Sequence, residues 1–230
     1  MDDWKNTDYR YVAYIDIMGF KNLVLRSTHS QVYSLMKKIK KTMEENEAMP
    51  WAGIIQKQVR STSYSDSIIL YSKNASFDSL RSIIASVSSL TNDLFELGIP
   101  HKGGIAFGKM TLDTENSIFF GQPLIDAFLL QEEVNFYGVV LHGTAQKEIS
   151  IVNRETLLLK NYLCPLKEGS SFHLVIVPIF LEEVESEDKL DKRYRKKLYD
   201  SLEKFRNHTS GHLRKYIDNT ETFFKFINNS

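Results

Sequence analysis

The order of strand-like and helix-like segments in the first half of the chain restricts its fold more than any other feature. Runs of β-branched and aromatic residues alternate with runs whose apolar residues recur every three or four positions, as in amphipathic helices. Strands are predicted at 10–17, 53–64, 67–72 and 101–112, and helices at 22–46 and 77–97. This β-α-β-β-α-β order is the ferredoxin-like pattern, so we predict an α+β fold with a mainly antiparallel sheet and helices packed on one face of it.

The second half of the chain adds further elements to this unit. A polar link at 113–117 is followed by a predicted helix within 118–134, and Pro123 suits the first turn of that helix. Further elements are predicted as a strand at 138–142, a helix at 144–160, a strand at 172–180 and a charged helical tail from residue 182.

Composition excludes several classes of protein. Of 230 residues, 42% are hydrophobic and 25% charged, which is enough for a globular core. The 29 basic and 29 acidic side chains balance, so we expect neither a nucleic-acid nor a membrane partner. The single cysteine, Cys164, excludes an internal disulfide and a cysteine-built zinc site. The polar start, MDDWKNTDYR, is unlike a secretory signal, and we therefore expect a cytoplasmic protein.

Two acidic residues stand where predicted strands end. Asp16 closes the first strand, in YIDIMGF, and Asp66 lies in the turn between the second and third strands. These strands are neighbours in the predicted topology, so the carboxylates converge at one edge, where like charges raise each other's pKa unless a cation lies between them. Oxygen ligands without nearby His or Cys favour Mg²⁺ or Mn²⁺. The alternative is a helix-capping Asp16 and an ordinary turn Asp66.

The residues after Asp16 suit a phosphate group. Gly19 has no side chain, and Phe20 begins a predicted helix whose first N–H groups lack partners within the helix. Such a helix start favours polyanions. Two acids, a divalent ion and these amides together indicate a nucleoside triphosphate site, although an ordinary helix start remains the alternative.

Five short motifs, in order, resemble those of class III nucleotidyl cyclase domains. IDIMGF is similar to their D-I-x-G-F motif, SYSDSIIL to their hairpin G-D-x with Ser65 in place of the glycine, and KGGIAFG to their R-x-G-I-x-x-G strand. GQPLIDAFLLQE resembles the helix motif G-x-x-V-N-x-A-x-R-x-E, and PLKEGSSFHLVIV the K-G-K-G strand. The resemblance implies a cyclase palm over residues 1–180. Residues 181–230 are expected to form a C-terminal helical extension packed on the same domain or dimer.

The resemblance also implies roles for residues at the end of the first strand. Asp16, Asp66 and the backbone carbonyl of Ile17 would bind two divalent ions per site, Mn²⁺ or Mg²⁺. The backbone N–H groups of Gly19 and Phe20 would bind the substrate phosphates. Similar cyclases form their sites between two protomers, so we expect a head-to-tail homodimer.

Two further residues, Lys167 and Arg60, match substrate-binding positions of the family, and Tyr64 lies two residues before Asp66. Lys167 matches the lysine that grips the triphosphate, with an exposed loop lysine as the alternative. Arg60 stands where the adenine-selecting lysine would be and could donate to a pyrimidine carbonyl or to a phosphate, with a solvated strand residue as the alternative. Tyr64 should point to the same face as Asp66, where it would shorten the base pocket to fit a single ring. A tyrosine packed on the sheet is the alternative.

The chain departs from purine cyclases where they read base and ribose. Ile125 and Leu129 replace the Asn that orients the ribose and the Arg that stabilises the transition state, and Ile118 replaces the adenine-reading acid. The combination resembles the pyrimidine cyclases of the bacterial Pycsar anti-phage system. It implies conversion of UTP, or secondarily CTP, to a 3′,5′-cyclic monophosphate sensed by a downstream effector. Two alternatives stay open: a purine cyclase with unusual base contacts, and a catalytically silent module that binds nucleotide and regulates a partner.

Overall fold

The computed structural model describes residues 4–48, 57–149, 158–178, 192–207 and 209–229. Its eight-stranded sheet has the order β2-β3-β1-β4-β6-β8-β7, and β5 pairs with β4 outside this path. The strands are β1 (Thr7–Ile17), β2 (Val59–Tyr64), β3 (Ser67–Ser72), β4 (His101–Asp113), β5 (Ile118–Gly121), β6 (Val139–Leu141), β7 (Leu159–Pro165) and β8 (Ser170–Ile176). These pairs are antiparallel except β4 with β6, which confirms the predicted fold class.

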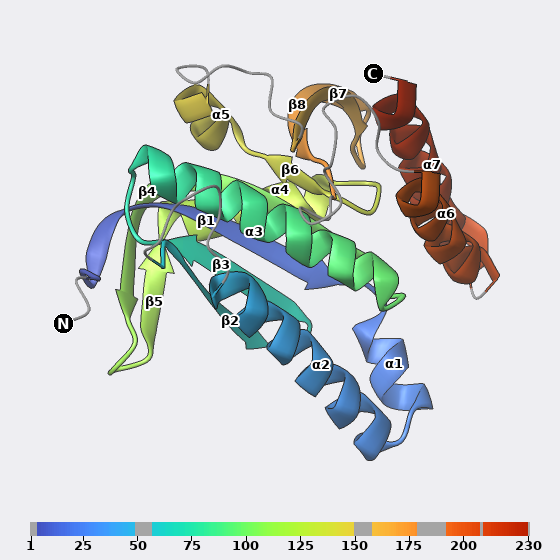
Figure 1. The fold of residues 1–230 in the computed structure, drawn as a ribbon, viewed down its shortest axis with the longest axis horizontal. Coiled ribbons are helices and arrows are strands. Elements are labelled where there is room, and N and C mark those ends of the chain that lie inside the picture. Colours follow the sequence, from blue (N-terminus) through green and yellow to red (C-terminus); the bar gives the residue numbers. More distant parts are fainter. Residues whose placement is uncertain (1–3, 49–56, 150–157, 179–191, 208, 230) are drawn as a thin grey trace.

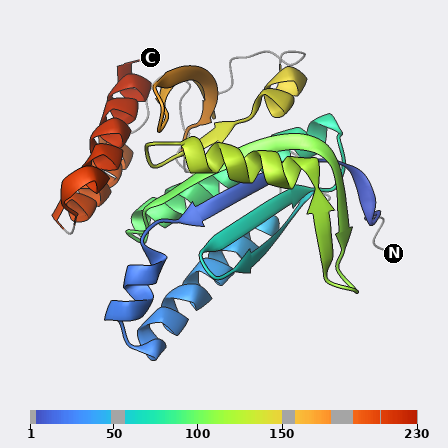
Figure 2. The same cartoon turned by 180° about the vertical axis from the view of Figure 1, so that it is seen from behind.

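Helices lie on both faces of the sheet, not on one face as predicted, because a helix from the part of the chain after the ferredoxin-like unit packs on the second face. The helices are α1 (Phe20–Arg26), α2 (His29–Ala48), α3 (Phe77–Glu96), α4 (Gln122–Glu133), α5 (Gly143–Ile149), α6 (Lys192–Asn207) and α7 (Arg214–Asn229), with a 3₁₀ turn, η2 (Gly211–Leu213). Helices α2 and α3 cover one face (Figure 1), and α4 packs on the other, against β1 and β4 (Figure 2). Helices α6 and α7 lie beside the end of the sheet at which β1 finishes. Among the described residues, no helix has the length and apolarity needed to cross a bilayer.

A first hydrophobic core joins α3 to the inner face of the sheet. Ile83, Val87 and Leu90 recur at helical spacing on α3 and are fully buried. They belong to one cluster with Ile15 and Ile17 of β1. Because strand side chains alternate, this packing turns the intervening residues of β1 toward the α4 face.

A second core joins the C-terminal helices to the same body. Phe223 and Phe224 of α7 are buried with Phe95 of α3 and Phe136, which follows α4. The Ser201 hydroxyl on α6 also donates to the backbone carbonyl of Phe95 at 2.7 Å. Helix α7 is therefore anchored close to the ends of α3 and α4.

The single helix predicted at 22–46 is wrong, because the chain forms two helices there. Helix α1 ends at Arg26, and Ser27 is extended. Gln31 Oε1 accepts the backbone N–H of Thr28 at 2.8 Å, while the N–H of Gln31 donates to Thr28 Oγ1 at 3.3 Å. This reciprocal capping box starts α2 afresh.

Two strands were not predicted. Residues 118–121, expected to lead into a helix, form β5 on the end of β4, and a turn closed by the Asn116 N–H and Asp113 Oδ1 at 3.1 Å joins them. Residues 159–160, expected to end a helix, instead begin β7. Short apolar runs do not distinguish strand from helix when the pairing partner is distant. Parts of the elements predicted at 53–64, 144–160 and 172–180 lie outside the described residues.

The close approach of α4 to the sheet requires a glycine at 104. A Cβ added there would lie 2.5 Å from the backbone carbonyl oxygen of Ala127. We expect Gly104→Ala to lower the free energy of unfolding by about 1–3 kcal/mol in urea titrations, because backbone must move to make room. At Gly143 an added Cβ meets nothing within 4 Å, so Gly143→Ala is the control. Equal effects of the two substitutions would contradict this account.

Candidate functional site

The end of β1 and the turn between β2 and β3 bring two acidic residues together. Asp16 lies opposite Ser67, the residue after Asp66. The backbone N–H of Ile17 donates to the backbone carbonyl of Asp66 at 2.8 Å. Ser65 adopts a φ of 56°, which allows the two-residue turn that presents Asp66. The carboxylates therefore lie on adjacent strands at one edge of the sheet.

The environment of Asp16 favours binding of a cation. Burial raises the pKa of Asp16 to about 6, and the nearby charge of Asp66 adds to that rise. A divalent cation between the two carboxylates would relieve both effects. Among the described residues, no three or more His, Cys, Asp or Glu side chains are arranged so that they could hold a metal ion by themselves. An ion here would therefore take other oxygen ligands, as Mg²⁺ does when it binds through one or two carboxylates plus phosphates and water.

The segment after Asp16 presents backbone N–H groups at the same edge. Gly19 caps α1 with a φ of 76°, a conformation that favours glycine. The first intrahelical bond runs from the N–H of Leu23 to the carbonyl of Gly19 at 3.0 Å, so the amides of residues 20–22 precede the helical ladder. Phe20 is partly buried against the first core and anchors this turn.

Two lysines lie where α4 ends. Lys102 faces Asp16 across the β1–β4 pair and is only 4% exposed. Its Nζ lies 3.3 Å from the carbonyl oxygen of Glu132. Lys167, in the loop between β7 and β8, lies 3.3 Å from the Glu132 carboxylate. Burial lowers the pKa of Lys102, and the charges of Glu132, Lys167 and Asp16 all act on it, so these groups form one charged cluster.

Of the two predicted base-binding residues, Tyr64 lies on the strand next to Ser67, the partner of Asp16, whereas Arg60 lies farther away. Tyr64, at the end of β2, is 85% exposed, so it is not packed on the sheet. Arg60 pairs with Tyr71 at the other end of β2, and its guanidinium lies 4.3 Å from the centroid of the Trp4 ring. Four residues of strand, about 13 Å, separate Arg60 from Tyr64.

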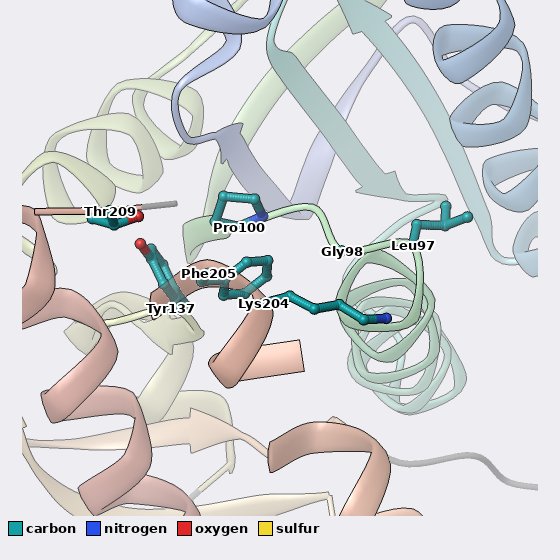
Figure 3. Close-up of a pocket in the computed structure, with 7 residues that line it drawn as sticks. All are labelled: Leu97, Gly98, Pro100, Tyr137, Lys204, Phe205 and Thr209. Carbon is teal, nitrogen blue, oxygen red and sulfur yellow. The ribbon is translucent and has the colours of Figure 1, made fainter. Parts of the chain in front are cut away.

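The structure contains a cavity of about 400 Å³, but neither Asp16 nor Asp66 lines it. Figure 3 shows it between the loop that carries Gly98 and Pro100 and the helical residues Lys204 and Phe205. Tyr137 lines its wall, whereas Asp16 and Asp66 do not. Asp16 is partly buried and Asp66 lies in the turn between β2 and β3, outside this cavity.

The sequence did not predict Lys102 and Glu132 of the charged cluster, or Tyr216 beside it. Lys102 was not among the predicted site residues, although pairing of β4 with β1, as in a ferredoxin-like sheet, places it opposite Asp16. Tyr216 of α7 lies with its ring centroid 5.8 Å from the Lys102 ammonium. No local sequence pattern signals that contact, because 114 positions separate the two residues.

The fold is similar to that of adenylyl and guanylyl cyclase catalytic domains. The monomeric guanylyl cyclase domain of RhoGC from Blastocladiella emersonii aligns with a TM-score of 0.55 and 11% identity, covering 75% of this chain and 96% of that one. The guanylate cyclase domain of RhGC from Catenaria anguillulae, in complex with GTP, gives 0.53 and 12%, covering 75% and 98%. A bacterial light-regulated adenylyl cyclase gives 0.51 and 10%, covering 75% and 91%.

No protein-family model matches the sequence, and no curated protein matches it. At these identities the similarity establishes the fold alone. The chain therefore has the cyclase palm fold.

The raised pKa of Asp16 makes stability depend on pH. Its value rises from 3.8 to about 6 on folding, so the native state holds this proton more tightly and Asp16 opposes folding increasingly between pH 4 and 6. In EDTA, we expect Asp16→Asn to be more stable than wild type by about 1 kcal/mol at pH 8, allowing for partial exposure. Urea titrations should show this difference vanish near pH 4. A variant less stable than wild type at pH 8 would contradict the assignment.

Proposed function

We propose that the protein is a nucleotidyl cyclase that converts UTP, with CTP as second choice, to the 3′,5′-cyclic monophosphate and pyrophosphate. The observation that carries the proposal is the cluster of Asp16, Asp66, the amides after Gly19 and two lysines at one edge of a cyclase-like sheet. Residues 1–180 would be the catalytic domain and 181–230 its extension. The product would act as a second messenger for a cyclic-nucleotide-sensing effector in anti-phage defence.

The two acids and one carbonyl would hold the metal ions. Asp16, Asp66 and the backbone carbonyl of Ile17 offer only oxygen, which fits Mn²⁺ or Mg²⁺. When bound, the ions would supply charge that acidifies the ribose 3′-hydroxyl and neutralises the leaving group. The pairing of β1 with β3 fixes both carboxylates before substrate arrives, so little reorganisation is needed.

The remaining groups of the cluster would bind the phosphates. The N–H groups of Gly19 and Phe20 would donate to phosphate oxygens, and Lys167 and Lys102 would neutralise part of the polyphosphate charge. In the reaction a bond forms between the 3′-oxygen and the α-phosphorus, the bond to the β-phosphate oxygen breaks, and the hydroxyl proton is released. Holding the triphosphate in line for this displacement is the main task of the residues.

Three residues support the choice of a pyrimidine. Ile118 cannot accept a hydrogen bond from an adenine amino group, and leaving that group unpaired costs about 1–3 kcal/mol. Tyr64 is exposed, so its ring is available to limit the depth of a base pocket. Arg60 could donate to a uracil carbonyl.

The proposed site is shared between two copies of the chain. Arg60 lies too far along β2 to read a base held at Asp66 of its own chain, but a partner could present it. Large apolar side chains are also exposed on β5 and α4: Ile118, Phe119, Phe120, Ile125, Phe128 and Leu129, which we call the α4–β5 surface. Such a surface is suited to burial against a second copy.

Turnover tests the proposal directly. Incubation with equimolar ATP, GTP, CTP and UTP and Mn²⁺ should yield mainly cyclic UMP by mass spectrometry, with about tenfold or greater discrimination against ATP. Asp66→Ala should abolish product without changing the circular dichroism spectrum, because Asp66 lies in a turn. Asp78→Ala, a matched change at an exposed acid in the first turn of α3, should leave turnover unchanged.

The other outcomes of this experiment would favour one of the two alternative functions or refute the role of the acid pair. Cyclisation of ATP or GTP as fast as UTP would favour the purine cyclase. Release of no cyclic product would favour the silent regulatory module, which the exposed Ile125 and Leu129 support. Full activity of Asp66→Ala would refute the role of the acid pair.

The shared site predicts that activity depends on association. Phe120 is 60% exposed on the α4–β5 surface, and Phe120→Asp should raise the dimer dissociation constant at least about tenfold and lower activity per protomer accordingly. Tyr33→Asp is the control, since Tyr33 is 61% exposed on α2, on the opposite face of the sheet. Light scattering and dilution assays measure both effects. A fully active monomer would argue against a shared site.

A further inference from the structure

The C-terminal helix α7 reaches the charged cluster through one side chain, Tyr216. Tyr216 is 9% exposed, and its ring stacks on that of Tyr137 with centroids 5.9 Å apart. The ammonium of Lys102 lies 5.8 Å from the centroid of the Tyr216 ring. An aromatic face attracts a cation, and the attraction grows when water is excluded from the pair.

Hydrogen bonds fix Tyr216 independently of Lys102. The hydroxyl of Thr220 accepts the backbone N–H of Tyr137 at 2.8 Å and donates to the backbone carbonyl of Tyr216 at 2.6 Å. The amide of Asn219 donates to the backbone carbonyl of Asn135 at 2.6 Å. This part of α7 is thereby tied to the segment that follows α4, and the ring is held in place before any ligand binds.

The hydrogen bonds that Lys102 makes to the described residues are long. Its Nζ lies 3.3 and 3.4 Å from the carbonyl oxygens of Glu132 and Val134, which is long for a charge-assisted hydrogen bond. The charges of Lys167, Glu132 and Asp16 also act on the phenol of Tyr216, so the ring lies within the same cluster.

We propose that Tyr216 is a positioning residue of the active site, whose ring holds the Lys102 ammonium where the polyphosphate tail of the nucleotide binds. The inference rests on the proposed function, because Lys102 meets a polyphosphate only if one binds at this edge. This role would make the C-terminal extension a functional part of the site, because the aromatic ring next to Lys102 comes from α7 and not from the palm.

The test is binding of magnesium tripolyphosphate to the full chain, measured by isothermal titration calorimetry. Tyr216→Leu removes the aromatic face and should weaken binding about five- to thirtyfold. Tyr216→Phe retains the face and should bind within about twofold of wild type. In a Lys102→Met background, Tyr216→Leu should cause no further loss, because the cation it orients is gone.

A second tyrosine separates positioning from general stability. Tyr199 of α6 contacts Phe224 in the same second core, and Tyr199→Leu should leave tripolyphosphate binding unchanged. If Tyr216→Leu does not fold, Tyr216→Met serves in the same comparison. Wild-type binding by the non-aromatic variant, equal losses in Tyr216→Leu and Tyr216→Phe, or an equal loss in Tyr199→Leu would each overturn the inference.

This test is separable from that of the proposed function. Tripolyphosphate binding requires no turnover, so a protein that binds it through Tyr216 and Lys102 but forms no cyclic product would refute the cyclase and leave the positioning role intact. Conversely, cyclic product from wild type together with unaltered binding by Tyr216→Leu would refute only the positioning role.

Discussion

The pairing of β1 with both β3 and β4 is the constraint on which the rest of the structure depends. The β1–β4 register runs from Thr7 opposite Thr111 to Ile17 opposite His101. This register buries Ile15 and Ile17 under α3, and alternation then turns Asp16 to the other face. A slip of one residue would put the carboxylate in the core and an isoleucine at the edge. One set of hydrogen bonds therefore specifies both the first hydrophobic core and the acid pair.

The charged edge destabilises the free protein, and the proposed metal and phosphate ligands would offset that cost. Asp16 is partly buried beside a second carboxylate, and Lys102 is almost wholly buried without a close counter-ion among the described residues. Structures retain such groups where a ligand offsets their cost, and perturbed acids and bases gather at functional sites for that reason. The second core supports this arrangement, because it fixes α7 against the end of α4 and brings Tyr216 to Lys102.

Features encoded by local sequence pattern could be predicted, and features that depend on distant contacts could not. Local features include the turn residues around Asp66, the glycine after Asp16 and the periodicity of α3. They were sufficient to predict the palm fold and the proximity of Asp16 and Asp66. Strands β5 and β7 are short and take their identity from partners in β4 and β8. The Thr28–Gln31 capping box encodes the break before α2. The apolar residues nevertheless continue at helical spacing across the break, and this spacing led to the prediction of a single helix. The position of Tyr216 could not be predicted from the sequence, because only the packing of α7 brings this residue next to Lys102.

The central claim is that Asp16 and Asp66 act as one cation-binding unit, and direct measurement of bound Mn²⁺ tests it. Electron paramagnetic resonance reports free Mn²⁺ as protein is titrated at pH 8, with and without a non-hydrolysable UTP analogue. The account predicts that Asp16→Asn and Asp66→Asn each abolish the binding seen in wild type, and that the double variant loses nothing further. Wild-type Mn²⁺ affinity in either single variant would contradict it.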